Sequence, residues 1–389
     1  MHTLFKLPFM FLVVGGCIGL LLRWHFVSPL PWLNYSYLLH GHSHIMFLGW
    51  IFNLLLTAYL LNYSLWQKNR YRVLFWLIQG LLAGMLISFP MQGYSVISIC
   101  LSVLHTFCIW LFTIWFFKDV PHGWSSHSIW CARVSLLLFA LASFGPFLLG
   151  VLKANGLGNS PLYYNVVYYY LHFQYNGVFI FGALSLWFKW IESKQVNLDS
   201  ARSYRSYVLL LVSIFPSYFL SVLWSKPPII FNVIGLAGAS IQIVAFICFV
   251  RLLWRVDVKA TKYARMLMHL AIASFGLKCI LQLVSAHPVV AQMALEVRPF
   301  LIAYLHLVVV GAVSLFLLAW CIEIKILTLH SPLAVLLVVT GFFGTELLMI
   351  FSGVTAINGS ALLIFLFSCL LLAGCVIFAF RVLIPSVHQ

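Results

Sequence analysis

The stretch HGHSHIMFLGWIFNLLLTAYLL, residues 40–61, places three histidines at alternate positions directly before an uncharged apolar run. The run is long enough to cross a bilayer, for which a helix needs about 20 apolar residues. An imidazole inside a bilayer is costly unless a partner or a bound group satisfies it. The stretch therefore predicts a membrane-spanning helix, and His40, His42 and His44 are the first candidates for a functional site.

Composition extends this prediction to the whole chain of 389 residues, of which 63% are apolar and only 7% charged. A soluble core of this size could not bury so much apolar surface, so we expect a polytopic membrane protein. Backbone groups in lipid must be satisfied within the segment, so the spans should be helices. We predict an all-α, twelve-helix transmembrane bundle forming one integral membrane domain over residues 1–389. The expected spans are 4–23, 38–61, 73–91, 94–117, 130–151, 162–189, 206–224, 230–253, 266–286, 299–322, 333–354 and 359–382.

The basic residues predict the topology. Seventeen of the 22 lysines and arginines fall in segments that twelve spans and a cytoplasmic N-terminus place in the cytoplasm, and four fall on the other side. This asymmetry favours both termini in the cytoplasm and location in the inner (cytoplasmic) membrane of a cell. Basic residues scattered over short loops do not form a nucleic-acid surface, so the lipid bilayer is the expected partner. The first apolar segment, 4–22, reads as a retained span and not as a signal peptide.

The cysteines exclude several classes of site. Most of the nine lie inside apolar runs, and neither CxxC nor CxxCH occurs. The pattern argues against a disulfide framework, a zinc knuckle and covalent haem attachment.

Histidines in four predicted spans share one depth. With this topology, His42, His44, His306, His172 and His105 lie about one to three helical turns from the outer ends of their spans. Scattered structural histidines would have no reason to share a depth, and neutral imidazole is a good ligand for iron or copper. All five are therefore candidate metal ligands. The alternative is that some of them only bond to loop carbonyls near the interface.

The spacing of the first three histidines separates their roles. His42 and His44 are two residues apart, which is about 200° of rotation on a helix, so their rings should point to opposite sides. They could serve two different cofactors but not one metal ion. His40 and His44 are four residues apart, share a face, and could together hold a metal ion.

A few other polar residues lie within the predicted spans. Lys278, Gln282 and Ser285 follow one helical face and predict either a polar or proton-conducting file or a structural lysine contact. Glu346 is the one acid well inside a span; it could partner Lys278, carry protons, or form a plain buried hydrogen bond. Tyr175 is deep enough to line a site, whereas the tyrosines before it suit an interfacial belt.

The histidine stretch resembles sequences of known haem proteins. HSHIMFLGW (42–50) is similar to the HxHxxxLGW stretch of cbb-type haem–copper oxidases and nitric-oxide reductases, whose two histidines bind different haems. It also resembles the HAHEMLFGF motif of the NnrS family of haem- and copper-containing membrane proteins. LHLVVVGAVS (305–314), with His306 and Gly311, resembles the second NnrS motif. YLHFQYNGVFIFGALSLWF (170–188) looks like the sixth helix of oxidase subunit I, where a histidine binds copper.

The resemblance implies a fold and a set of ligands. The fold would be that of oxidase subunit I, which has internal threefold pseudo-symmetry. One or two b-type haems would be bound, with His42 or His44 and His306 as axial ligands. His172 would be a further ligand or a distal copper residue, and Tyr175 stands one position before the place where oxidases carry a tyrosine. Copper stays open, because the span 206–224 has no histidine where oxygen-reducing members have two.

Three functions remain open at this point. The first is electron transfer to, or binding of, nitric oxide or oxygen, with oxidoreductase activity undecided. Electrons would come from a quinol or a separate cytochrome, and partner subunits are compatible with this function. The second is a copper or zinc transporter or assembly factor with a ladder of histidines. The third is a cofactor-free accessory subunit whose histidines bond only within the bundle.

Overall fold

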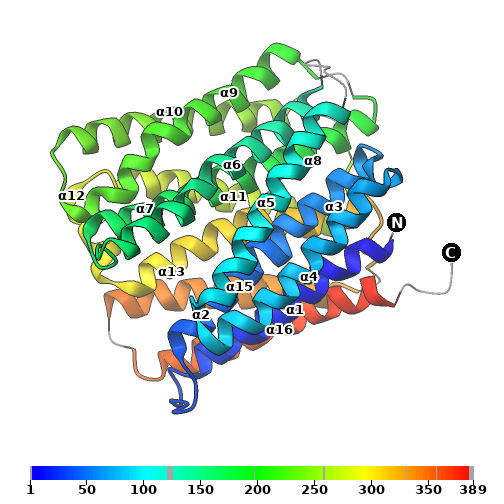
Figure 1. Ribbon diagram of the computed structural model, residues 1–389. Coiled ribbons are helices and arrows are strands. Elements are labelled where there is room, and N and C mark those ends of the chain that lie inside the picture. The colour runs from blue at the N-terminus through cyan, green and yellow to red at the C-terminus, as the bar shows by residue number, and fades with distance from the viewer. Residues whose placement is uncertain are drawn as a thin grey trace. The chain divides into compact units, whose positions relative to one another are not determined.

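The computed structural model describes residues 2–120, 126–196, 198–256, 259–329, 331–355 and 357–384. Within these ranges the chain forms helices and contains no strand (Figure 1). The predicted all-α class is confirmed, and its physical reason is the one given above: a helix satisfies its own backbone hydrogen bonds in an apolar solvent.

Eleven helices in the described ranges are long and apolar enough to cross a membrane, and each matches a predicted span. The chain is thus a multi-pass membrane protein. The remaining predicted span, 162–189, is helical from Pro161 to Ser193 but falls outside this set. Its many tyrosines, together with His172, Gln174 and Asn176, make it too polar to qualify by composition. The buried polar residues that lower its hydropathy are the ones that make it a candidate site.

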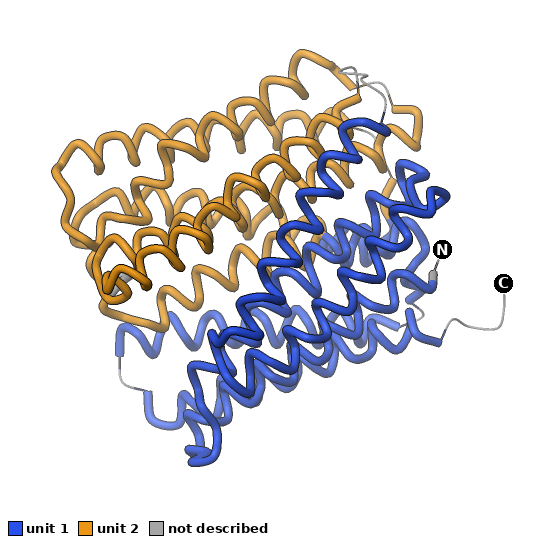
Figure 2. Tube along the Cα trace, in the orientation of Figure 1, with its two compact units in different colours: residues 1–121, 261–267, 317–389 blue, residues 122–260, 268–316 orange. Residues whose placement is uncertain are grey.

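The chain folds into two compact units, each assembled from segments that are distant in the sequence (Figure 2). Unit 1 comprises residues 1–121, 261–267 and 317–389, and unit 2 comprises residues 122–260 and 268–316. The expectation of one membrane domain over residues 1–389 stays a prediction.

In unit 1, α1 packs on α16, and α16 packs on α15 (Figure 1). On its other side α1 contacts α2 and η1, while α2 packs on α4 and α4 on α5. At the ends of α4 and α5, the carboxylate of Asp119 binds Arg70 and also Lys68, at 3.0 Å. The elements are α1 (His2–Trp24), α2 (Tyr35–His44), η1 (Ile45–Phe52), α3 (Asn53–Asn62), η2 (Leu65–Gln67), α4 (Asn69–Gln92), α5 (Val96–Asp119), α14 (Leu315–Glu323), α15 (Leu333–Val354) and α16 (Ser360–Leu383).

In unit 2, α6 contacts α7, η3 and α8, and α9 packs on α10. Glu192 at the end of α8 accepts hydrogen bonds from the backbone N–H of Ser128, at 3.1 Å, and from two serine hydroxyls, and so caps the start of α6. The elements are α6 (His127–Ala154), α7 (Pro161–His172), η3 (Phe173–Val178), α8 (Phe179–Ser193), α9 (Ser200–Ser217), η4 (Tyr218–Ser225), α10 (Ile230–Leu253), α11 (Lys262–Val284), α12 (Pro288–Glu296), α13 (Arg298–His306) and η5 (Leu307–Ser314).

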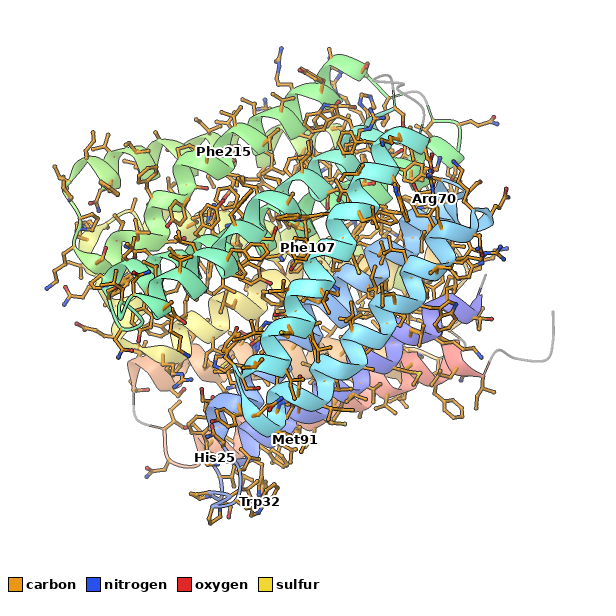
Figure 3. All side chains as sticks on the ribbon, viewed as in Figure 1. His25, Trp32, Arg70, Met91, Phe107 and Phe215 are labelled. Carbon is orange, nitrogen blue, oxygen red and sulfur yellow. The ribbon has the colours of Figure 1, made fainter. Side chains whose placement is uncertain are left out.

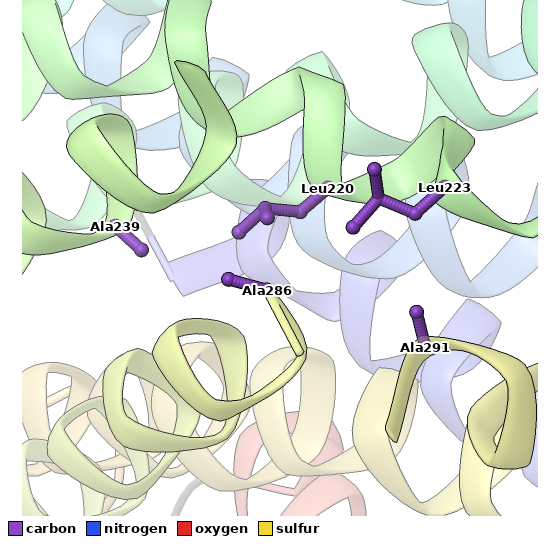
Figure 4. Packing of buried hydrophobic residues seen from close by; sticks show 5 residues of the cluster. All are labelled: Leu220, Leu223, Ala239, Ala286 and Ala291. Atoms are coloured by element: carbon purple, nitrogen blue, oxygen red, sulfur yellow. The ribbon is translucent and has the colours of Figure 1, made fainter. Parts of the chain in front are cut away.

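Small apolar residues set the packing around η4 in unit 2. Pro216 near the end of α9 removes a helical donor, and the chain continues as the 3₁₀ helix η4. Leucines of η4 then pack against alanines from α10, α12 and the turn after α11 (Figure 4). The cluster consists of Leu220, Leu223, Ala239, Ala286 and Ala291.

Large apolar side chains also lie on outer surfaces of the molecule. Trp32, Met91, Phe107 and Phe215 are all exposed, Met91 by 76% (Figure 3). Met91, Phe107 and Phe215 lie in membrane-length helices, where exposed residues of this size suit contact with lipid tails and not with water. Trp32 lies in the segment between α1 and α2.

Candidate functional site

Each of the three π-helical segments begins directly after a candidate histidine. η1 follows His44, η3 follows His172 and η5 follows His306. In each copy a glycine stands five residues after the histidine. The three sequences are HIMFLG (44–49), HFQYNG (172–177) and HLVVVG (306–311). π-helical turns are rare and occur mostly at functional sites. The sequence carries this spacing in all three spans, whereas the resemblance to the second NnrS motif used it at His306 and Gly311 alone.

In the first two copies, the residue two positions before the histidine packs on a glycine of the preceding span: His42 on Gly19 of α1, and Tyr170 on Gly145 of α6. The corresponding residue of the third copy, Tyr304, lies beside Tyr175 of η3, with ring centroids 6.2 Å apart. The three short sequences are HSH (42–44), YLH (170–172) and YLH (304–306). The three spans thus share this sequence pattern, and only the first carries histidine at both positions.

His42 lies against α1 in a position that glycine makes available. Its Nδ1 is 2.8 Å from the carbonyl oxygen of Gly15, so Nδ1 carries the proton and donates it, and Nε2 carries the lone pair. A Cβ atom at Gly19 would lie 2.7 Å from Cε1 of His42, so only glycine lets the ring sit there. A fixed tautomer with a lone pair on Nε2 is the form in which histidine binds iron.

His44 points to a different neighbour, as its spacing from His42 predicts. Its ring stacks on Phe89 of α4 at 4.1 Å and meets the edge of Tyr94 at 5.7 Å. Its Nδ1 donates a hydrogen bond to the carbonyl of His40 at 2.9 Å, so Nε2 again carries the lone pair. His40 also contacts Tyr94, at 4.6 Å, so His40 and His44 do share a face.

His105 on α5 is the unusual histidine of unit 1. It is 1% exposed, and neither ring nitrogen has a hydrogen-bond partner among the described residues. A buried polar group without a partner costs about 1–3 kcal/mol, so two such nitrogens on one ring call for an explanation.

His172 in unit 2 is buried and satisfied. Its Nε2 donates to the carbonyl of Ile214 at 2.9 Å, and its Nδ1 accepts from the Asn176 amide at 3.1 Å. Both nitrogens are therefore used inside the protein. A copper ion could bind here only if one of these hydrogen bonds were broken, which the sequence did not indicate.

Tyr175 lies beside His172, and His306 begins η5 in the same unit. The ring of Tyr175 is 6.2 Å from that of His172 and 6.2 Å from that of Tyr304, and the side chain is 6% exposed. His42, His44 and His105 belong to unit 1, and His172 and His306 to unit 2. The five histidines that were predicted to share one layer therefore belong to two different units.

The polar residues of the predicted proton path have partners that the sequence did not reveal. Lys278 is fully buried, and its Nζ donates to Oε1 of Gln242 on α10 at 2.7 Å. Gln282, one turn further along α11, is also buried. In unit 1, Glu346 accepts a hydrogen bond from the Thr345 hydroxyl at 3.2 Å and interacts electrostatically with Arg23.

No group of three or more histidine, cysteine, aspartate or glutamate side chains within the described ranges could hold a metal ion. This agrees with the span 206–224, which has no histidine. The donor set therefore does not fit a three-histidine copper centre. It does fit a haem at His42, because haem iron brings four ring nitrogens of its own and takes only axial ligands from the protein.

Comparison with known proteins supports the fold. No family model matches the chain, and neither does any curated protein. Among solved structures, it resembles a chain of a heme-copper terminal oxidase dimer determined by cryo-electron microscopy. The TM-score is 0.70 at 14% identity, and the match covers 100% of this chain and 83% of that one. The predicted oxidase subunit I-like fold is confirmed at the level of architecture, whereas the resemblance to NnrS stays a prediction.

Proposed function

We propose that this protein binds b-type haem in the membrane and uses His42 as an axial ligand. The observation that carries the proposal is the setting of His42 against α1. The Gly15 carbonyl fixes its tautomer, and the missing side chain at Gly19 makes room for its ring. The fold likeness to a haem–copper oxidase chain supports the same cofactor class. Without CxxCH the haem would be held by its iron ligands alone.

Within unit 2, His306, the residue directly before the π segment η5, is a further candidate axial ligand. His44 faces another side of α2 than His42, so the two histidines would hold different bound groups. A bound b-type haem would supply reversible one-electron chemistry and a coordination position for a small diatomic molecule. The chain's own part would be to fix the imidazole tautomer and to keep water away with buried apolar helices.

We propose binding of, or electron transfer to, nitric oxide or oxygen as the task. The absence of a three-histidine donor set within the described ranges makes a copper-assisted oxidase centre the weaker proposal. A quinol or a separate cytochrome would deliver the electrons, and partner subunits are compatible with this role. The distribution of lysine and arginine supports an inner-membrane location with both termini in the cytoplasm.

We further propose that Lys278, with Gln242 and Gln282, forms a polar path in unit 2. A buried lysine whose ammonium group donates to an amide oxygen is an expensive arrangement inside a membrane and usually has a function. Glu346 with Arg23 is the corresponding candidate in unit 1.

The test is to purify the protein in mild detergent and to record its optical spectrum with total iron, copper and zinc. A Soret band with split α and β bands after reduction is the expected result. Metal without a Soret band would support the transporter or assembly factor instead. Neither metal nor a Soret band would support the cofactor-free accessory subunit.

His42→Tyr is the sharpest variant, because the chain itself carries tyrosine at the matching positions 170 and 304 and should fold with it here. We expect this variant to lose one haem per chain. His25→Ala, at a histidine before α2 that accepts a hydrogen bond from the Leu30 backbone N–H, is the matched control and should keep all haem. Full haem content in His42→Tyr would refute the assignment of His42.

A further inference from the structure

We infer that one face of α4 in unit 1 is a binding site for an anionic phospholipid. The α4 face consists of Arg72, Trp76, Gly80 and Ala83, which the helical repeat places in one row. All four residues are exposed. The basic end of the row would hold the lipid phosphate, and the apolar part would hold an acyl chain. The inference does not depend on haem, because the α4 face contains none of the candidate haem ligands.

The α4 face begins at a basic cluster, where the start of α4 lies beside the end of α5. The cluster contains four basic side chains, those of Lys68, Arg70, Arg72 and Lys118, and one carboxylate, that of Asp119, so its net charge is +3. Asp119 is already shared by Lys68, at 3.0 Å, and Arg70. Arg72 is exposed, and its side chain has no hydrogen bond or ion pair with any residue in the described ranges. One guanidinium group is therefore available to a phosphate.

The first turn of α4 is electrostatically unfavourable without a further anion. It carries two arginines and no acidic residue, and Lys68 at the N-cap makes no side-chain hydrogen bond to it. The N-terminal end of a helix is its positive end, where negative charge is stabilising. Arg70 is held by Asp119 and by the ring of Trp115, whose centroid is 5.1 Å from the guanidinium carbon (Figure 3). A phosphate at Arg72 would supply negative charge, and arginine can bind it with two parallel N–H···O bonds.

The apolar part of the α4 face has open space next to an exposed tryptophan. Trp76 lies one turn after Arg72 and is 55% exposed. Gly80 and Ala83 follow on the same face, and a Cβ atom at Gly80 would meet no other atom within 4 Å. Tryptophan is typical of the depth at which lipid headgroups meet the acyl chains. The basic cluster, Trp76 and the open space thus follow the order of phosphate, glycerol and acyl chain in one lipid.

Charge distinguishes a lipid from a second protein chain at this face. Small residues on an exposed membrane helix also allow another helix to approach. A symmetric pair of these chains within one membrane would bring the same ends of both α4 helices together, and with them two basic clusters of like charge. An anionic phospholipid brings the opposite charge to the same place and is attracted by basic residues near the membrane surface. Charge complementarity therefore favours the lipid.

The experiment uses the full chain in mild detergent, titrated with phosphatidylglycerol or with phosphatidylcholine of the same acyl chains. Native mass spectrometry counts the lipids that stay bound to each chain. We expect one phosphatidylglycerol per chain to bind more tightly than phosphatidylcholine. Equal affinity for the two lipids would overturn the inference without the need for any variant.

Three variants test the α4 face. Arg72→Gln should weaken phosphatidylglycerol binding about five-fold, which corresponds to about 1 kcal/mol for one basic residue at a membrane surface. Arg72→Lys should keep most of the affinity, because it keeps the charge. Gly80→Leu should also weaken binding, because the leucine fills the open space while every charge stays in place.

Arg265→Gln on α11 is the matched control and should keep the full affinity. Arg265 is likewise an exposed arginine near the start of a membrane-length helix, but the glycine of that helix, Gly276, is covered by Phe246. The inference is wrong if Arg265→Gln and Arg72→Gln weaken binding equally, since the attraction would then be diffuse. It is also wrong if Gly80→Leu binds phosphatidylglycerol as the wild type does. A dimer that Gly80→Leu converts to monomers would assign the α4 face to a second copy of the chain instead.

Discussion

The end of α2 and the end of α7 have the same local structure but different hydrogen bonding. In both, a histidine leads into a π-helical segment and a glycine follows five residues later. His172 uses both ring nitrogens inside unit 2, with Ile214 and Asn176. In unit 1, Nδ1 of His44 donates to the carbonyl of His40 in the same helix, and neither ring nitrogen of His105 on α5 has a partner in the described ranges. Backbone geometry alone therefore does not make a histidine a ligand. The hydrogen-bonding groups on neighbouring helices determine whether its nitrogens are available to a bound group.

The largest effect on stability should come from replacing His172, whose two ring nitrogens both have hydrogen-bond partners. His172→Leu would leave the Ile214 carbonyl and the Asn176 amide buried without their partner, each at about 1–3 kcal/mol. We expect the free energy of unfolding to fall by about 2–5 kcal/mol. Thermal unfolding in detergent, with metal content measured alongside, would check this. A loss of copper or haem in folded His172→Leu protein would show that His172 is a ligand after all.

The corresponding change in unit 1 should have the opposite sign. His105→Leu replaces a ring with two unsatisfied nitrogens by an apolar side chain, which relieves about 1–3 kcal/mol per group in the metal-free protein. We expect metal-free His105→Leu to unfold at a higher temperature than metal-free wild type. Destabilisation of the metal-free variant would mean that His105 has a structural role like that of His172.

A smaller effect should separate the two equivalent glycines. Gly19→Ala would put a methyl group 2.7 Å from Cε1 of His42, whereas Gly145→Ala would meet Tyr170 Cβ at 3.0 Å. Because only the first displaces the proposed ligand, Gly19→Ala should weaken haem binding about 10-fold, as loss of a supporting contact does. Gly145→Ala should leave haem unchanged. Haem titration of both variants, refolded or expressed without haem, makes the comparison.

The smallest effect should come from the ion pairs that join α4 to α5. Arg70 and Lys68 both contact Asp119, and their side chains are 41% and 46% exposed. Exposed pairs contribute about 0–1 kcal/mol and weaken with salt. Arg70→Ala should therefore lower the free energy of unfolding only slightly, as thermal unfolding in detergent would show. A large loss of stability would show that the ion pairs, and not apolar packing, hold α4 and α5 together.

The spans and the direction of the first histidines could be predicted from the sequence. Composition alone located eleven of the spans, and the 200° between His42 and His44 follows from helix geometry. The partners could not be predicted. Ile214 is 42 residues from His172 and offers only a backbone carbonyl, which every residue has. Likewise, nothing in the sequence marks Gln242 as the partner of Lys278, 36 residues away.

Whether the ring nitrogens of a histidine have hydrogen-bond partners could not be predicted from the sequence either. The residues around His105 in the sequence do not differ in kind from those around a structural histidine, whereas the structure shows that neither of its ring nitrogens has a hydrogen-bond partner in the described ranges. The expectation that His172 ligates copper rested on likeness to an oxidase helix. That likeness predicts the helix, but it does not predict the hydrogen bonds that His172 makes with Ile214 and Asn176.

In the π-helical segments, the number of residues matters more to the position of the preceding histidine than the identity of those residues. Each turn contains more residues than an α-turn, so removal of one residue between Ile45 and Phe52 would restore a regular helix. The same deletion would rotate everything before it by about 100°, and the ring of His44 would leave both Phe89 and Tyr94. Distant relatives should accordingly keep the same number of residues between the histidine and the glycine, even where no other residue is identical.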